Sequence, residues 1–227
     1  MAIILLYGIN SSGKDAVSSE ISGSIDNCII TGESRLLMYH LGLIPDFGAG
    51  YKVEAKTYKE LEKTDSDTIE KISNVDIPRT IKSLKRKGKN IIVLSHLVYA
   101  LFQKDQTVQY LTERPIPSWI CQQGDYFIYL NSPSADILER RIRDKNNNIG
   151  KRKIQTIKEI KEHQKLSDIK WEELKSRTIQ KNFDEQELRE WVSKFKIVIL
   201  KEINKEAFKL GKRFTATNFY LVIQKAI

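Results

Sequence analysis

The feature that most constrains this sequence is a glycine-rich loop directly after a short apolar run. The run is Ile3-Ile4-Leu5-Leu6-Tyr7, and the loop reads Gly8-Ile9-Asn10-Ser11-Ser12-Gly13-Lys14-Asp15. This is the G-x-x-x-x-G-K pattern of a phosphate-binding loop between a strand and a helix. Glycine is needed where a Cβ would collide with a phosphate, and successive backbone N–H groups then serve as donors. The pattern therefore predicts binding of a nucleoside triphosphate.

Two side chains of the loop have distinct expected roles. Lys14 is placed to bring a compact positive charge to the β- and γ-phosphates, beside the partial positive charge of the following helix N-terminus. Asp15 stands where the common motif has Ser or Thr for magnesium. A carboxylate can ligate magnesium directly or through water, although it adds negative charge beside the phosphates. Asp15 is therefore the candidate metal ligand, and the expected ATP-binding residues are Gly8, Asn10, Ser11, Ser12, Gly13, Lys14 and Asp15.

The composition fits a domain with an anionic ligand. The 227 residues lie near the upper end of the single-core range, and 38 basic against 29 acidic residues give a formal net charge of +9. This charge suits phosphates, and it would suit RNA or DNA as well. No apolar run approaches the roughly 18 residues that span a bilayer, so we expect a cytoplasmic protein without a membrane partner. Cys28 and Cys121 are isolated thiols, which favours buried small hydrophobes over a disulfide or zinc site.

Short apolar strands alternate with amphipathic helices, which predicts an α/β fold with a parallel sheet and helices on both its faces. Strands are expected at 28–30, 90–96, 126–130 and 197–200, and helices at about 13–25, 36–42, 77–87 and 185–195 and at the C-terminus. Residues 45–67 favour an exposed excursion from the sheet. The helix after Pro133 is expected to turn Ile137, Leu138 and Ile142 inward.

A basic segment follows that helix. Residues 140–153 contain seven basic residues and one acid, namely Arg140, Arg141, Arg143, Lys145, Lys151, Arg152 and Lys153 against Asp144. Arg140 and Arg143 share a helix face, and Asp144 is placed to pair with Arg140 across one helical turn. Thr156 and Glu159 have the spacing of a capping box that starts the next helix. The segment is therefore expected to be a short basic loop between two helices.

In this order, the segments resemble those of the adenylate-kinase-like P-loop nucleoside monophosphate kinases, in particular the compact archaeal-type branch. The resemblance covers residues 1–166 and is carried by G-I-N-S-S-G-K-D, T-G-E-S-R-L-L-M-Y-H-L-G-L, I-I-V-L-S-H, F-I-Y-L-N-S-P, R-R-I-R-D and E-I-K-E-H-Q. It implies a single P-loop NTPase domain over 1–227, with an acceptor-binding insertion at about 31–75 and a lid at about 144–156. The implied activity is magnesium-dependent transfer of the γ-phosphate of ATP to a nucleoside monophosphate or similar small acceptor.

The resemblance also implies roles for the charged side chains. Such transfer needs mainly alignment and positive charge, and the candidate catalytic residues are Lys14, Arg140, Arg143 and one of Lys151 or Arg152. The candidate acceptor-binding residues are Arg35, Arg79 and His96, the last at the carboxyl end of a central strand. The alternatives are a surface salt bridge for Arg140, a solvated basic turn for 151–153, surface positions for Arg35 and Arg79, and a packed His96. His40 and His163 are expected to be structural or exposed.

One position departs from the family pattern. The central strand often ends in Asp-Thr-His or Asp-Ser-His, where the Asp organises magnesium, whereas this chain has Leu94-Ser95-His96. Either the metal-organising carboxylate has moved to Asp15, or the site binds nucleotide with little turnover. Two other functions stay open: a nucleotide-dependent RNA- or ribosome-associated ATPase, suggested by the net charge, and a kinase for a different small metabolite.

Overall fold

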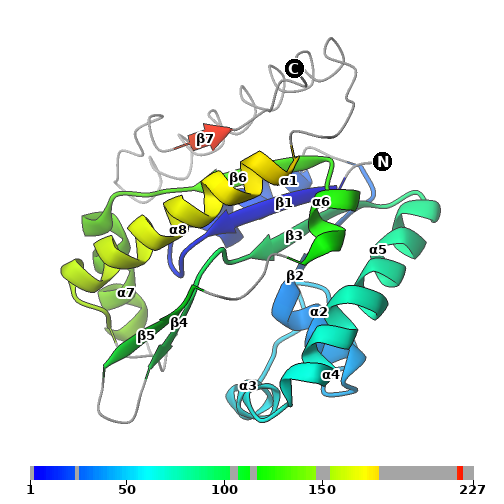
Figure 1. Ribbon diagram of the computed structural model, residues 1–227, viewed down its shortest axis with the longest axis horizontal. Coiled ribbons are helices and arrows are strands. Elements are labelled where there is room, and N and C mark those ends of the chain that lie inside the picture. Colours follow the sequence, from blue (N-terminus) through cyan, green and yellow to red (C-terminus); the bar gives the residue numbers. More distant parts are fainter. Residues whose placement is uncertain are drawn as a thin grey trace. The chain divides into compact units, whose positions relative to one another are not determined.

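The computed structural model describes residues 3–23, 26–102, 107–112, 117–146, 154–178 and 219–221 of the chain. It shows an α/β P-loop NTPase fold in which a parallel sheet is flanked by helices (Figure 1). The five-stranded sheet has the order β2-β3-β1-β6-β7, formed by β1 (Ile3–Gly8), β2 (Cys28–Gly32), β3 (Asn90–Ser95), β6 (Tyr126–Leu130) and β7 (Phe219–Leu221). The predicted fold class is confirmed.

The strand register reveals one antiparallel edge. β2 and β3 are parallel, with Cys28 opposite Asn90 and Gly32 opposite Leu94. β7 pairs antiparallel with β6, so that Ile128 lies opposite Leu221. The expectation of helix near the C-terminus is therefore wrong for residues 219–221, because this segment takes the backbone hydrogen bonds that β6 offers.

The helices agree closely with the predicted ones and add several. They are α1 (Lys14–Gly23), α2 (Glu33–His40), α3 (Ala55–Glu62), α4 (Ser66–Lys71), the π-helical turn η1 (Ile72–Asp76), α5 (Ile77–Arg86), α6 (Ser118–Gln123), α7 (Ser134–Asn146) and α8 (Ile157–Thr178). A second sheet, not predicted, is the antiparallel hairpin of β4 (Tyr99–Phe102) and β5 (Val108–Leu111). Gly88, with a φ of 79°, follows the C-cap of α5 at Lys87, as the glycine stop predicted.

The chain divides into two compact units. The first contains residues 1–6, 18–95 and 117–127, and the second contains 7–17, 96–116 and 128–227. β1 and β6 each contribute residues to both units.

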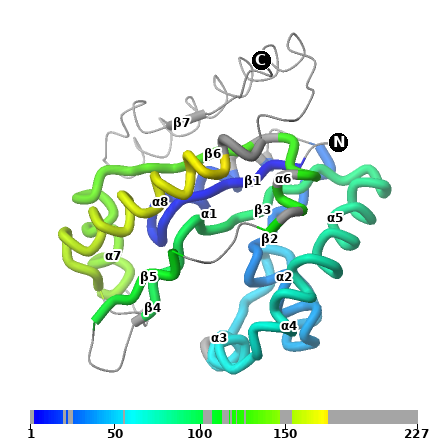
Figure 2. The backbone as a smooth tube through the Cα atoms, in the orientation of Figure 1, coloured from blue at the N-terminus to red at the C-terminus, as the bar shows by residue number. Residues whose placement is uncertain are grey.

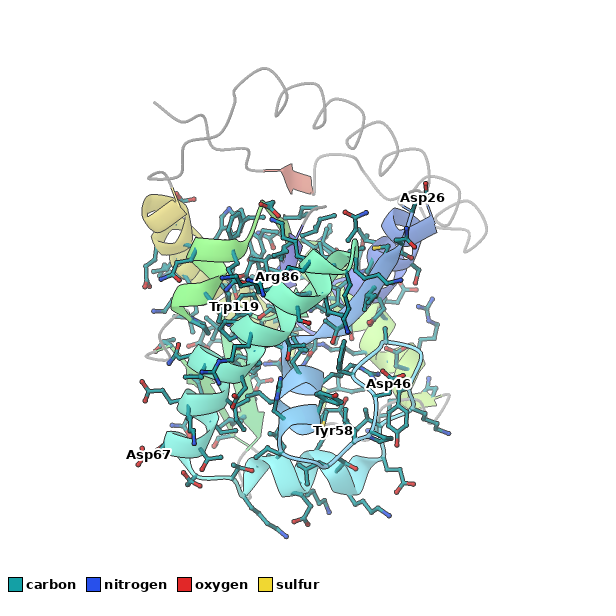
Figure 3. The ribbon with its side chains drawn as sticks, turned by 90° about the vertical axis from the view of Figure 1, so that its right-hand side faces the viewer. Asp26, Asp46, Tyr58, Asp67, Arg86 and Trp119 are labelled. Carbon is teal, nitrogen blue, oxygen red and sulfur yellow. The ribbon has the colours of Figure 1, made fainter. Side chains whose placement is uncertain are left out.

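The first unit is built on β2, β3 and a long helix. Ile91, Ile92 and Val93 of β3 are buried, as are Ile77 and Ile81 on the inward face of α5. Helices α4, η1 and α5 follow one another without a break (Figure 2). Figure 3 shows α5, which carries Arg86, beside α6, which carries the buried Trp119. The predicted helix at 77–87 is confirmed.

The excursion after α2 is largely exposed. Asp46 lies in the loop after α2, Tyr58 on α3 and Asp67 on α4 (Figure 3). Asp46 and Asp67 are exposed, and Tyr58 is half-buried. Lys63 pairs with Glu60 one turn away at 2.9 Å. The prediction of an exposed excursion at 45–67 is confirmed, although the segment carries helices of its own.

The second unit packs α7 against α8 beside the glycine-rich loop (Figure 1). Ile9 of the loop, Ile137 of α7 and Ile160 of α8 form a buried apolar cluster. The capping box before α8 is confirmed, since the Thr156 N–H donates to Glu159 Oε2 at 2.6 Å and the Glu159 N–H to Thr156 Oγ1 at 3.3 Å.

One helix-face prediction in this unit is wrong. Ile142 is 43% exposed, whereas Ile137 is fully buried and Leu138 partly buried. The face of α7 that turns inward carries the buried Arg140 instead, because that arginine hydrogen-bonds to the glycine-rich loop.

Several predictions lie outside the described residues. These are the centre of the lid at 147–153, the helix at 185–195 and the strand at 197–200. Among the helices that the structure describes, none combines the length and the apolar character needed to cross a membrane. Cys28 is a free, half-buried thiol whose pKa is raised by burial, so the expectation of full burial is not met there.

Candidate functional site

The glycine-rich loop has five successive backbone carbonyls, of residues 8–12, that each accept a hydrogen bond from a side chain. The ammonium group of Lys14 donates to Gly8 O at 2.6 Å and to Ile9 O at 3.0 Å. Arg141 Nη2 donates to Asn10 O at 3.0 Å, and Arg140 Nη1 donates to Ser11 O at 3.0 Å. Ser132 Oγ donates to Ser12 O at 2.8 Å. Three of these four side chains are cationic.

This pattern orients the loop for an anion. In a trans peptide unit the N–H points opposite to the C=O, so carbonyls that face side chains leave the N–H groups of the next residues on the other side. One of these groups, the Ser12 N–H, donates to Ile9 O at 3.2 Å within the loop. A series of N–H groups turned to one side makes a concave anion site. Ser11 has a φ of 64° and Gly13 a φ of 99°, conformations that let the chain turn this tightly.

Gly8 is required by close packing. A Cβ built there would lie 2.5 Å from Ser12 Oγ and 2.9 Å from the backbone oxygen of Leu130 in β6. Both distances are too short for carbon against oxygen. The first glycine of the motif thus lets the loop approach the neighbouring strand, in addition to any role toward a ligand.

Lys14 is buried, and its surroundings disfavour the charged form of its side chain. Only 8% of the residue is exposed, and its ammonium group contacts neutral carbonyls. Burial lowers the pKa of Lys14 to about 7, with Asp15 acting to raise it and Arg141 to lower it further. An anion placed against this ammonium group would favour its charged form.

Ser12 and His163 supply buried polar atoms near the loop. The hydroxyl of Ser12 is buried and has no hydrogen-bond partner among the described residues, as expected for a group whose partner is a ligand. His163 Nε2 lies 2.9 Å from Val98 O, and burial lowers the pKa of His163 to about 4. The imidazole is therefore neutral, which fits the predicted structural role and avoids a further positive charge near Lys14 and Arg141.

The arginines of α7 separate into buried and exposed ones. Arg140 is 8% exposed, so the alternative of a surface salt bridge does not describe it. Arg143 is exposed on the same helix. Lys151 and Arg152 lie outside the described residues. Arg141 was expected only as part of the basic run, yet it contacts the loop directly, and no short-range signal distinguishes it from Arg143.

A metal ion at this loop would rest mainly on phosphate oxygens. Within the described part of the chain there is no group of three or more His, Cys, Asp or Glu side chains arranged to hold a metal. Asp15 lies exposed in the first turn of α1. A single carboxylate beside bound phosphates fits magnesium, which commonly binds through one or two carboxylates and substrate phosphates.

The three candidate acceptor residues differ in their surroundings. Arg35, in the first unit, donates from Nη1 to Gly48 O at 3.0 Å and to Tyr51 O at 2.7 Å, so it holds the loop after α2. The side chain of Arg79 is 77% exposed, and its nearest carboxylate, that of Asp76, lies 3.9 Å away. His96, in the second unit, is half-buried with its ring 5.4 Å from that of Tyr99.

A buried carboxylate in the first unit was not predicted. Glu33, the first residue of α2, is 4% exposed and accepts a hydrogen bond from Ser95 Oγ at 2.5 Å. The two residues follow or end adjacent parallel strands, at the edge where ligands of open α/β sheets gather. The run Thr31-Gly32-Glu33 at the end of β2 is the sequence signal for this carboxylate.

Known proteins offer only distant structural likenesses to this chain. No protein-family model matches the sequence, and a search of curated proteins found no match. The chain is similar to shikimate kinase from Acinetobacter baumannii, in complex with shikimate, with 16% identity, a TM-score of 0.44, and coverage of 77% of this chain and 80% of that one. It is also similar to a chain of the Pnkp1/Rnl/Hen1 RNA repair complex, with 14% identity, a TM-score of 0.40, and coverage of 76% and 45%.

A third similar structure is TT1252 from Thermus thermophilus, with 11% identity, a TM-score of 0.40, and coverage of 92% of this chain and 97% of that one. All three likenesses are distant.

Proposed function

We propose that this chain is an ATP-dependent phosphotransferase that uses magnesium and acts on a nucleoside monophosphate or a similar small acceptor. The observation that carries the proposal is the loop at residues 8–12, whose carbonyls are all taken by side chains and whose neighbours include three cations. A loop prepared in this way suits a polyphosphate better than a neutral ligand.

The described residues would act mainly by binding and orientation. Loop N–H groups and the Lys14 ammonium group would hold the β- and γ-phosphates, and Arg140 and Arg141 would keep the loop in shape. Magnesium, with Asp15 as its one protein carboxylate, would neutralise charge on the phosphates. Such fixed positive groups stabilise a loose phosphoryl-transfer transition state without covalent help from a side chain.

The adenylate-kinase-like arrangement completes the proposal. In it, residues 31–75 bind the acceptor and residues 144–156 close over the donor phosphates, within one domain. Arg35, Arg79 and His96 would bind the acceptor, and Arg143 with Lys151 or Arg152 would contact the migrating group. Among these, Arg79 has the exposed, weakly paired guanidinium that an incoming phosphate would require.

A specific observation favours a second acceptor class. The buried Glu33 carboxylate, hydrogen-bonded to Ser95, would repel a monophosphate dianion but can accept a hydrogen bond from a hydroxyl group. A kinase for a small hydroxyl-bearing metabolite is therefore the second candidate function.

A product analysis separates the candidates. The purified protein is incubated with ATP and magnesium together with each nucleoside monophosphate in turn, and then with nucleosides and polyhydroxy acids. Phosphorus NMR distinguishes a new phosphoanhydride from a new phosphate ester. An anhydride supports the first acceptor class and an ester the second, whereas ATP hydrolysis that no acceptor accelerates would contradict both and favour an ATPase.

A further inference from the structure

A chain of side-chain hydrogen bonds leads away from the glycine-rich loop within the second unit. Arg141 donates from Nη2 to Asn10 O and from Nη1 to Gln155 Oε1. Gln155 Nε2 donates to the hydroxyl of Tyr110 at 3.3 Å, and that hydroxyl donates to Glu159 O at 2.7 Å. This series of hydrogen bonds thus joins the loop, α7, Gln155 in the segment before α8, β5 of the hairpin, and the first turn of α8.

In this series of hydrogen bonds, the donor and the acceptor of each bond can be assigned. The Arg141 guanidinium can only donate, so the amide oxygen of Gln155 must face it and the amide nitrogen must face Tyr110. Gln155 is 1% exposed, so water cannot replace a lost partner. Burial raises the pKa of Tyr110 to about 12, which keeps its hydroxyl protonated and able to donate.

Packing against a neighbouring ring fixes Tyr110. Its ring lies 5.2 Å from the ring of His163, which is itself held by the contact of Nε2 with Val98 O. The buried, neutral ring of His163 therefore holds the hydroxyl of Tyr110 within hydrogen-bond reach of Gln155.

We infer that Gln155 and Tyr110 are positioning residues for the phosphate loop, acting through Arg141. This inference rests on the proposed function, because it assumes that the loop binds ATP. Gln155 fixes the Arg141 guanidinium on Asn10 O, and Tyr110 fixes Gln155. A carbonyl that loses its donor is free to rotate, and the N–H of the following residue then turns away from the phosphates.

The test measures ATP affinity in conservative variants. Tyr110→Phe removes only the hydroxyl, and Gln155→Leu removes the amide with little change in volume. Each should weaken ATP binding by about fivefold, the size of one lost buried hydrogen bond. Calorimetry with ATP in EDTA removes magnesium, and with it any metal contact of Asp15, from the comparison.

Ser167→Ala is the matched control, because it also removes only a hydroxyl group. Ser167 of α8 is 1% exposed, lies in the second unit and donates to the backbone oxygen of His163 at 2.8 Å, within its own helix. It should lower the melting temperature about as much as Tyr110→Phe while leaving ATP affinity within twofold. Equal losses of affinity in both variants would mean that Tyr110 acts through general stability, which overturns the inference.

A double-mutant cycle tests the route through Arg141. Arg141→Lys keeps the charge but cannot bridge Asn10 O and Gln155 in the same planar geometry. If Tyr110 acts through Arg141, Tyr110→Phe should cost less than twofold in the Arg141→Lys background. An undiminished fivefold effect there would overturn the inference. Normal ATP affinity in both Tyr110→Phe and Gln155→Leu would overturn this inference and leave the proposed function intact. A wild-type protein that binds no ATP would overturn the proposed function as well.

Discussion

The glycine-rich loop and the excursion at 45–67 differ in how far away in the sequence their hydrogen-bond partners lie. Arg141 contacts Asn10 across 131 positions of sequence, and Ser132 contacts Ser12 across 120. In the excursion, by contrast, Lys63 pairs with Glu60 and the Thr68 N–H with Asp65, each three positions apart. Both segments are rich in polar residues, but the loop is held by residues more than 100 positions away. The excursion is held by near neighbours and, at residues 47–51, by Thr31 and Arg35, which are 13–16 positions away.

This difference has an energetic meaning. A buried polar group that loses its partner stays unsatisfied, whereas an exposed one returns to water. Substitutions around the loop should therefore have large effects on binding, and substitutions in the excursion should have small ones. The following predictions test that contrast in decreasing order of expected size.

The largest effect is expected from Lys14→Ala. Its ammonium group is the buried cation expected at the β- and γ-phosphates, and two lost charge-assisted contacts correspond to at least a roughly 100-fold loss of ATP affinity. Calorimetry with ATP and magnesium measures the loss, and Lys63→Ala, in the exposed excursion, is the control. Unchanged affinity in a folded Lys14→Ala protein would show that the loop is not the nucleotide site.

Asp15→Ala should come next. If Asp15 organises magnesium, the variant should weaken ATP binding by roughly 1.5–3 kcal/mol with magnesium and much less with EDTA. If the carboxylate only repels the phosphates, its removal should tighten binding, most clearly without metal. Affinities of both proteins under both conditions decide the matter, and tighter binding by the variant throughout would remove the metal-organising role.

A pH dependence should follow from Lys14. Burial lowers its pKa to about 7, so at pH 8 most of the empty protein has a neutral Lys14. Bound phosphates raise that pKa, so ATP binding takes up a proton, and affinity should fall as pH rises above 7, by at most about tenfold per pH unit. Calorimetry at pH 8 in two buffers of different ionisation enthalpy counts the protons. Identical heats in both buffers would contradict the uptake.

The smallest effects on ATP affinity are expected from Arg35→Ala and Arg79→Ala. Arg35 holds two carbonyls of the loop after α2 and is half-buried, so the free energy of unfolding should fall by about 1–2 kcal/mol while ATP affinity stays within twofold. Arg79→Ala, at an exposed position, should change stability by less than about 0.5 kcal/mol. Urea titrations compare the two. A larger loss of unfolding free energy in Arg79→Ala than in Arg35→Ala would contradict this expectation.

The parts of the fold that were predictable from sequence depend on short-range patterns. The capping box of Thr156 and Glu159, the glycine stop at Gly88 and the strand–loop–helix order around Lys14 each involve residues within a few positions. Such signals need no knowledge of the rest of the chain. The β4–β5 hairpin was missed because none of the strong two-residue turn signals lies between Phe102 and Val108.

The residues that sequence reasoning missed depend on distant partners. Nothing near Arg141 distinguishes it from Arg143, because its role is set by Asn10 and Gln155. Ile142 was assigned inward by helical periodicity, which cannot foresee that the buried face of α7 carries an arginine. The hydrogen-bond partner of Glu33 is Ser95, 62 positions away, which no local pattern around Glu33 indicates.

The π-helical turn η1 means that the helix around it could be one residue shorter and keep the same inward face. A π turn holds one residue more than the α-helical turn it replaces, and the helices on either side keep their packing faces despite that extra residue. Between Ile72 and Asp76 the helix therefore already contains an insertion, next to the buried Ile77. A related sequence one residue shorter here could form an uninterrupted α-helix with the same inward face. Alignments of this region should accordingly place a single-residue gap within the helix, where gaps are normally avoided.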